Sequence, residues 1–338
     1  MAIQGQIRHR KHQVGSETTF GSNTPATRRL PYRGSIVVEP NRTTPDVDTG
    51  SLDPVLASYF GAVDVSGSWE GPAAFDDLPY IYTLGIKGGV TPTGSATGRI
   101  WTYQAASLTS DTLGSATDEW SDDVTSDSIV AAGGVVNSWN LEFGEDLSVF
   151  QLSTENLYSK ATFGAGITAG LTVDSTPQWV YGAHTVIYMD AAPGSIGITP
   201  LADNVHGATF SVNNNFDPKR FANGSNSGWN LAGYGRGPRE IEFVVRLAKG
   251  TQSVAEAQTL DDVPVPTRYF DIKTTSTELV TGGSTPYSNS IRFPAELIGR
   301  SDTEINNNSV IELTYRGKYD ETLAYALRCV VTNSLASL

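Results

Sequence analysis

The sequence predicts an all-β protein in which helix is a minority. Glycine is abundant, with 34 residues, and Thr, Ser and Asn are frequent, whereas long charged helix formers are few. Several segments alternate apolar and polar residues with a period of two, which is typical of strands with one buried face. The 338 residues are enough for two domains of about 150 residues each and a terminal arm.

Residues 1–50 are mostly polar and interrupted by proline, with one expected strand at residues 35–39. We expect an extended N-terminal arm that lies outside any core. Up to residue 42 it carries seven Lys or Arg and two Glu, which leaves 16 basic and 34 acidic residues in the body, a net charge of −18. The basic arm fits a solubilised tail or a segment that docks on an acidic neighbour. The acidic body argues against wrapping nucleic acid, because Lys and Arg neutralise phosphates in such complexes.

After the arm, the pattern predicts a strand at residues 62–70 and a short helix or turn within residues 72–85. Gly85 is able to cap that helix, and Pro79 limits its regularity. A strand follows at residues 98–105. Residues 107–134 are acidic and rich in Ser and Thr, so we expect a long loop, which at this length is functional or disordered.

The clearest strands form a predicted hairpin from residues 137–143 and 147–153, separated by a Gly-Glu-Asp turn. Trp139, Leu141 and Phe143 share one face of the first strand, and Asn140 and Glu142 share the other. This pattern predicts an antiparallel sheet with one buried and one wet side. Glu142 therefore points to water or to a channel.

The second half of the chain continues the β pattern. Residues 164–200 are interpreted as a connection that contains a strand at residues 185–189, and residues 206–216 open the second half. The expected elements then are strands at 239–250, 270–277, 288–297, 309–317 and 323–333, with a helix at 253–263. Cys329 is the only cysteine and lies in an apolar run, which predicts a buried, inert thiol and no intrachain disulfide.

Three short motifs occur in the same order in both halves, which we interpret as an internal duplication. They are an Asp-Asp-aliphatic-Pro sequence that ends a helical segment (76–79 and 261–264), a strand opened by Asn-Ser (137–139 and 289–291) and a Ser-Val strand (148–152 and 309–313). The offsets differ, so insertions are required. We therefore expect two related β-sandwich domains, at residues 51–195 and 196–338, each with a short flanking helix.

Other chemistry is weighed against this structural interpretation. Asp122, Asp123 and Asp127 lack the spacing of a calcium loop, so a solvated acidic loop is favoured. The four histidines are too scattered for a zinc signature, the Gly-Ser-Asn-Ser-Gly sequence at residues 224–228 lacks a nucleophile serine, and no P-loop is present. Paired glycosidase carboxylates are invisible at this level. We expect no enzyme activity, no metal and no cofactor.

Several segments together resemble the major tail tube proteins of long-tailed, siphovirus-type bacteriophages. They are the run FGAVDVSGSWEGPAAFDDLPYIYTLGIKGG, the strand GRIWTYQA, the hairpin VVNSWNLEFGEDLSVFQLSTE, the segment FDPKRF and the closing strand ALRCVVTN. The resemblance covers roughly residues 52–333 and rests on the order and character of the segments.

The resemblance implies a structural virion protein whose subunits form rings that stack into a hollow tube for DNA passage. It implies no specific DNA binding and no membrane. A duplicated chain would form homotrimeric, pseudo-hexameric rings, with a homohexamer as the second choice. Tail terminator, tape measure and tail tip proteins are the implied partners, and the protein is expected in the phage tail after assembly in the host bacterial cytoplasm.

The acidity of residues 100–159, ten Asp or Glu without one Lys or Arg, then divides into two expected roles. Polar strand faces would line the lumen and repel DNA, with Asn140, Glu142, Gln151, Glu312 and Thr314 as candidates and Arg292 as an exception to the acidic pattern. The long loop and the arm would make contacts between rings. The candidates for these contacts are Arg8, Arg10, Lys11, Arg28, Arg29, Asp118, Glu119, Asp122, Asp123 and Asp127.

The alternative function is a carbohydrate-binding or adhesin β-sandwich of a phage tail tip or bacterial surface. Trp101, Trp120, Trp179 and Trp229 would then stack on sugar rings. Aromatic residues are also enriched in cores and at subunit interfaces, which is the interpretation we favour for each of them. A major capsid protein is a further possibility, but no long amphipathic spine helix is predicted.

Overall fold

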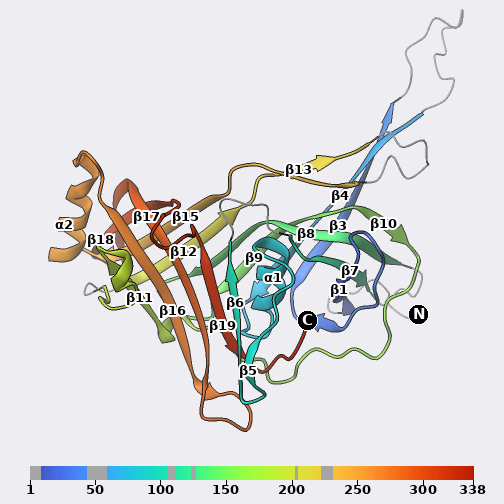
Figure 1. Ribbon diagram of the computed structural model, residues 1–338, viewed down its shortest axis with the longest axis horizontal. Helices are drawn as coiled ribbons and strands as arrows, with labels where there is room; N and C mark the ends of the chain where they lie inside the picture. Colours follow the sequence, from blue (N-terminus) through green and yellow to red (C-terminus); the bar gives the residue numbers. More distant parts are fainter. Residues whose placement is uncertain (1–8, 44–58, 106–111, 123–126, 202–204, 222–230) are drawn as a thin grey trace, which may run out of the picture.

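A computed structural model describes residues 9–43, 59–105, 112–122, 127–201, 205–221 and 231–338 (Figure 1). In this part of the chain the protein is mostly β, with a large antiparallel sheet, a two-stranded ribbon and two short α-helices. The predicted all-β class is confirmed. The division into two domains is not visible as two separate cores, because one hydrophobic cluster contains residues from both halves.

The first half contributes six strands that pair in the spatial order β1, β7, β8, β9, β4, β3. Their bounds are β1 Lys11–Glu17, β3 Arg33–Thr43, β4 Tyr59–Pro72, β7 Ser115–Ser121, β8 Ser128–Phe143 and β9 Gln151–Tyr158. Every neighbouring pair is antiparallel. The helix α1, Leu78–Gly85, lies between β4 and β7 in the sequence.

The second half repeats this order with β11, β16, β17, β18, β15, β12. Their bounds are β11 Thr185–Asp190, β12 Val205–Asn213, β15 Glu240–Ala248, β16 Thr267–Leu279, β17 Pro286–Ile305 and β18 Asn308–Gly317. Every neighbouring pair is again antiparallel. The helix α2, Thr251–Gln258, lies between β15 and β16, as α1 lies between β4 and β7.

The two halves are joined by backbone pairing. β12 of the second half pairs with β8 of the first, so one sheet runs through both. β19 (Arg328–Asn333) connects β17 to β6 (Gly98–Gln104), and β5 (Thr93–Ser95) pairs with β6. β2 (Arg28–Leu30) pairs with β1, β10 (Lys160–Phe163) pairs with β8, and β13 (Phe216–Lys219) and β14 (Gly233–Arg236) form the ribbon.

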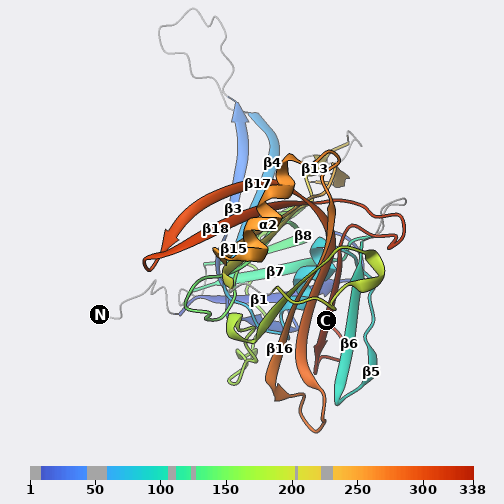
Figure 2. The ribbon, with the colours of Figure 1, turned by 90° about the vertical axis from the view of Figure 1, so that its left-hand side faces the viewer.

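The core lies on one side of the joined sheet, around α1. Every residue of α1 is buried, and the helix contacts β8, β6 and β19, so it fills the space between these strands (Figures 1 and 2). Large aromatic side chains dominate the packing: Trp69, Trp101, Trp139, Tyr82, Tyr103, Phe210, Phe243, Phe270, Phe293 and Tyr315 are fully buried. Such side chains bury the most apolar area per residue and stabilise the fold accordingly.

The expectation of an N-terminal arm outside the core is wrong for residues 11–32, where β1 and β2 form and Val14, Leu30 and Tyr32 belong to the main core. The polarity of the segment concealed this, because β1 is an inner strand between β2 and β7 and its polar side chains find buried partners. The strand expected at residues 35–39 is confirmed within β3. Two antiparallel strand pairs, β3–β4 and β17–β18, extend from the body of the protein in different directions (Figure 2).

The prediction of a long loop at residues 107–134 is also wrong for the described part of that range. Residues 115–121 are β7, and β8 begins at Ser128. Seven consecutive β7 residues pair with β1, so the polar sequence is satisfied by a neighbouring backbone and by buried hydrogen bonds. β11, the two helices and the closing strands overlap their predicted ranges, but β17 continues to Ile305, beyond the predicted end at residue 297, and β19 begins at Arg328, not at residue 323.

Two of the three repeat motifs do not occupy equivalent places. Asp76 and Asp77 precede α1, whereas Asp261 and Asp262 follow α2. Asn289 pairs inside the part of β17 that contacts β16 and β19, whereas Asn137 lies at a bulge inside the part of β8 that pairs with β9. The repeat is therefore carried by strand order, not by these motifs.

Cys329 is buried on β19, and burial raises the pKa of its thiol, so the reactive thiolate is scarce at neutral pH. We expect the folded protein to resist a maleimide or Ellman's reagent, and to react with one equivalent only after denaturation in guanidinium chloride. Rapid labelling of the native protein would contradict the placement of β19 in the core.

Candidate functional site

The candidate site is a polar face on the side of the joined sheet opposite the core. Residues that stand opposite each other on paired strands point to the same side, and side chains along a strand alternate. Gln151 of β9 stands opposite Glu142 of β8, which stands opposite Thr209 of β12. Thr209 stands opposite Val244 of β15, and Val244 opposite Thr314 of β18. One row of side chains thus crosses five strands and both halves.

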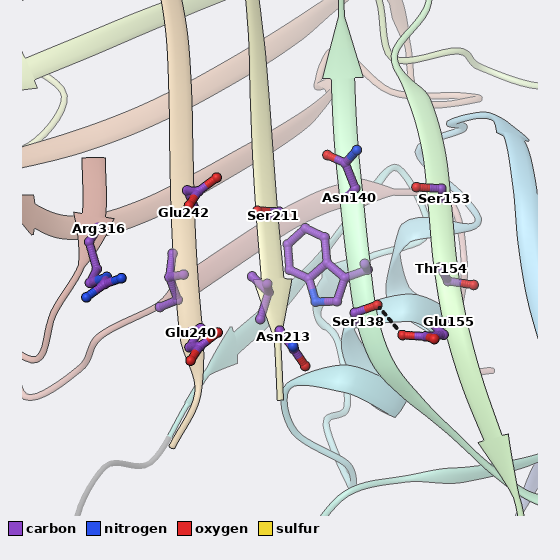
Figure 3. A pocket seen from close by; sticks show the side chains of 13 residues that line it. Ser138, Asn140, Ser153, Thr154, Glu155, Ser211, Asn213, Glu240, Glu242 and Arg316 are labelled. Atoms are coloured by element: carbon purple, nitrogen blue, oxygen red, sulfur yellow. Dashed lines mark hydrogen bonds between the residues drawn. The ribbon is translucent and has the colours of Figure 1, made fainter. Parts of the chain in front are cut away.

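A parallel row lies beside it and has the same polarity. It runs through Ser153, Asn140, Ser211, Glu242 and Arg316, in the strand order β9, β8, β12, β15, β18. Figure 3 shows these side chains standing on one face of the strands. The five lumen candidates Asn140, Glu142, Gln151, Glu312 and Thr314 are therefore brought to one surface, although they come from segments about 170 residues apart in the sequence.

Exposure separates the two faces cleanly. Glu142, Gln151, Ser153 and Glu242 are exposed, and Asn140 and Thr314 are half-buried. On the alternate positions, the side chains pack into the core: Trp139, Leu141, Phe143, Leu152, Phe210, Val212, Phe243, Val245, Leu313 and Tyr315 are buried. Moving the register by one residue would exchange these sets, so burial of the aromatic face fixes which side chains the other face presents.

The polar face is hollowed into a groove of about 370 Å³. Its polar lining consists of Ser138, Asn140, Ser153, Thr154, Glu155, Ser211, Asn213, Glu240, Glu242 and Arg316. Ser138 donates a hydrogen bond to Glu155 at 3.2 Å, which Figure 3 marks. Three carboxylates and one guanidinium give the groove an excess of negative charge, and its remaining polar groups are small hydroxyls and amides.

Beyond the groove, the same face holds compensated charge pairs, among them Lys318 and Glu296 at 2.6 Å, where Glu296 stands opposite Arg316. Arg246 of β15 lies 2.8 Å from Glu312 of β18. Arg292, the exception to the acidic pattern, is likewise paired, because its Nε donates to Asp271 at 2.9 Å and Asp271 also accepts a hydrogen bond from Ser290. Asp271 is almost fully buried, so Arg292 serves chiefly to neutralise it.

Asp118 and Glu119, predicted to contact a neighbouring ring, are buried inside their own subunit. Trp69 Nε1 donates to Asp118 at 2.8 Å, Tyr158 also donates to it, and His12 Nε2 lies 3.4 Å away. Burial raises the pKa of the Tyr158 hydroxyl, and the neighbouring Asp118 carboxylate raises it further. These contacts join β1, β4, β7 and β9, so Asp118 is a structural carboxylate.

Glu119 closes a second set of buried contacts. It accepts hydrogen bonds from the backbone N–H and the hydroxyl of Thr168, at 2.6 and 2.7 Å, and from Gln13 at 3.3 Å. The meeting of the basic segment with the acidic one, expected between subunits, thus takes place between β1 and β7 of one chain. The physical reason is that a carboxylate with several donors is stable away from water.

The described basic residues that were predicted to make contacts between rings also have partners within the chain or line a pocket. Arg28 donates to Asp77 at 2.7 Å and joins β2 to the start of α1; burial raises the pKa of the Asp77 carboxyl, and the guanidinium partly offsets that rise. Arg10 lies over the ring of Trp120, 5.5 Å from its centroid. Lys11 and Arg29 line a nearby pocket of about 260 Å³ together with Arg10 and Arg33.

The remaining predicted residues are placed as follows. Asp122 is half-buried and Asp127 exposed. Arg8 and Asp123 lie outside the described residues, as does Trp229. Of the other tryptophans proposed to stack on sugars, Trp101 is 1% exposed and hydrogen-bonded to Asn333, while Trp120 and Trp179 are half-buried. Trp101 is therefore a core residue and is not accessible for stacking on a sugar ring.

Sequence reasoning missed Ser211, Glu240, Glu242 and Arg316 as members of the face. The signal was present in the strand at residues 240–248, where Glu240, Glu242, Val244 and Arg246 alternate with buried apolar residues. What the sequence lacked was the pairing of β12 with β8, which places this strand beside the first hairpin.

No protein-family model matches the chain, and no curated protein matches it significantly. Among the described residues, no group of three or more His, Cys, Asp or Glu is arranged to hold a metal ion. No helix in the described ranges is long and apolar enough to cross a membrane.

Adjacent substitutions on β8 test the assignment of the two faces. We expect Leu141→Ala to lower the free energy of unfolding by about 3 kcal/mol, because it leaves a cavity in the core. Glu142→Lys, one residue away, is expected to change it by less than about 0.5 kcal/mol, because the side chain is exposed. Urea unfolding followed by tryptophan fluorescence measures both, and equal losses would refute the assignment.

Proposed function

We propose that this protein is a structural subunit that polymerises into stacked rings and forms the hollow tube of a bacteriophage tail, through which DNA passes. The observation that carries the proposal is the continuous polar face, which takes side chains from both halves of the chain and places all five lumen candidates on one surface. The resemblance of the sequence to major tail tube proteins suggests the assembly, a stack of rings, in which such a face would line the lumen.

The chemistry of the face suits a wall along which DNA moves without sticking. Double-stranded DNA carries one negative charge per about 1.7 Å of its axis, so a wall rich in Lys and Arg would hold it. On β8, β9, β12, β15 and β18 the face carries five carboxylates, Glu142, Glu155, Glu240, Glu242 and Glu312, and two guanidiniums, Arg246 and Arg316, the first of which is paired with Glu312. Phosphates therefore meet mild repulsion and small neutral side chains.

The repeated strand order supports a duplicated subunit. Two related β-sandwich domains per chain, each with its short helix, would let three chains build a ring with near six-fold symmetry, and six chains per ring are the second choice. The tube would need no cofactor. Its ends would contact tail terminator, tape measure and tail tip proteins, and assembly would take place in the cytoplasm of the host bacterium before the tail enters the virion.

Electron microscopy of the purified protein tests this proposal. We expect concentrated protein in negative stain to show rings with a central channel or tubes built from them, because the proposal requires the subunits to associate with one another. Protein that stays monomeric at every concentration and ionic strength, and also after addition of tail tip complexes as seeds, would overturn the proposal. Tight binding of the assembled protein to double-stranded DNA at physiological salt would contradict the role of the polar face.

A further inference from the structure

Among the described strands, the repeated order reveals an edge in the second half that lacks the partner its counterpart has in the first half. In the first half, β8 is a long strand that changes partners along its length. Its residues 128–134 pair with β7 and its residues 138–143 pair with β12. β12 belongs to the second half, where it follows β11 in the sequence.

β7 and β12 lie on the same side of β8. Residues 138–142 of β8 pair with both β9 and β12, so these two strands lie on opposite sides of it. Residues 129–132 pair with β10, on the side opposite β7, and β10 follows β9 after a single residue. β9 and β10 therefore share one side of β8, and β7 and β12 share the other.

In the part of the chain that the structure describes, β17 has the same arrangement except that one strand is missing. Its residues 295 and 296 pair with both β16 and β18, which places those strands on opposite sides. β16 stops at the partner of Glu296, and residues 299–305 pair only with β18 among the described strands. Residues 300–304 are all exposed. In the first half, the corresponding side is occupied by β12.

The counterpart of β12 is β3, and its outer edge is open as well. β12 pairs with β15 on one side and β8 on the other, whereas β3 pairs only with β4 in the described part of the chain. Figure 1 shows the β17–β18 pair toward one end of the long axis and the β3–β4 pair toward the other, so a chain cannot join its own two edges. We infer that β3 of a second copy pairs antiparallel with residues 299–304 of β17.

The internal junction also gives the register of this contact. The β8–β9 pair has a bulge at Asn137 and the β17–β18 pair has one at Ile298, so Ser138 corresponds to Gly299 and Asn140 to Ser301. The strand pairing can be followed from β9 through β4 to β3 in the first half and from β18 through β15 to β12 in the second half. In this alignment, Val37 of β3 corresponds to Ser211 of β12. Since Ser211 stands opposite Asn140, Val37 of one copy is expected opposite Ser301 of the next.

This register continues the polar face from one copy to the next. Ser301 stands opposite Glu312, and Val37 opposite Ser66, so both belong to that face. On the other side of the β17 edge, Arg300 and Asp302 form an exposed ion pair. Charged side chains on an open edge discourage pairing with arbitrary strands, so the edge is suited to a specific partner. The contact is head to tail, which permits ring closure.

Cysteine crosslinking tests the register of the inferred pairing. The inferred pairing rests on the proposed self-assembly. Val37→Cys and Ser301→Cys are placed in separate chains, which are mixed, assembled and oxidised with diamide. Cys329 is buried and does not interfere. Since directly opposed residues have Cβ atoms about 5 Å apart, we expect about tenfold more disulfide-linked dimer than with Ile36→Cys and Ser301→Cys, whose side chains face opposite sides. Neither single variant alone should crosslink.

The outcomes separate the pairing from the function. A doubly substituted chain carrying Val37→Cys and Ser301→Cys should give a ladder of linked oligomers on a non-reducing gel, and urea unfolding of each reduced variant checks that it is folded. Normal rings or tubes with no more crosslinking than the Ile36→Cys control would overturn the inferred pairing and leave the proposed function standing. Wild-type protein that never assembles would overturn both.

Discussion

Backbone pairing along β8 is the constraint on which the rest of this structure depends. The first part of the strand pairs with β7 and β10 and holds the N-terminal strands, and the second part pairs with β9 and β12 and holds the second half of the chain. Because paired strands share their faces, this one junction forces the aromatic core of both halves to one side and the hydroxyl, amide and carboxylate side chains to the other.

The acidic residues that look alike in the sequence serve two different physical purposes. Asp118 and Glu119 are buried and receive hydrogen bonds from Trp69, Tyr158, Thr168 and Gln13, so they stabilise the joining of β1 and β7 to the fold. Glu142 and Glu242 on the polar face are exposed and contribute to the charge of that surface. Burial, and not composition, separates the two groups.

Local pattern was enough to predict the buried Trp139, Leu141 and Phe143 of β8 and its outward Glu142, since alternation is a property of the strand alone. The second strand of the hairpin was predicted at residues 147–153 but lies at Gln151–Tyr158, so its bounds were wrong. The strands β1 and β7 could not be predicted in this way. Their polar residues are stabilised by partners far away in the sequence, such as His12 and Asp118, 106 residues apart. The face as a whole was also beyond the sequence, because it exists only once β12 lies beside β8.

The central claim is that the polar face built from both halves lines the inside of a closed assembly. A cryo-electron microscopy map of the assembled protein tests it most directly. The account predicts a continuous antiparallel sheet around an axial channel, with Glu142, Glu242 and Thr314 directed toward the channel and Trp139 and Phe243 directed away. A map in which these glutamates lie on the outer surface, or in which neighbouring subunits meet without joining their sheets, would contradict it.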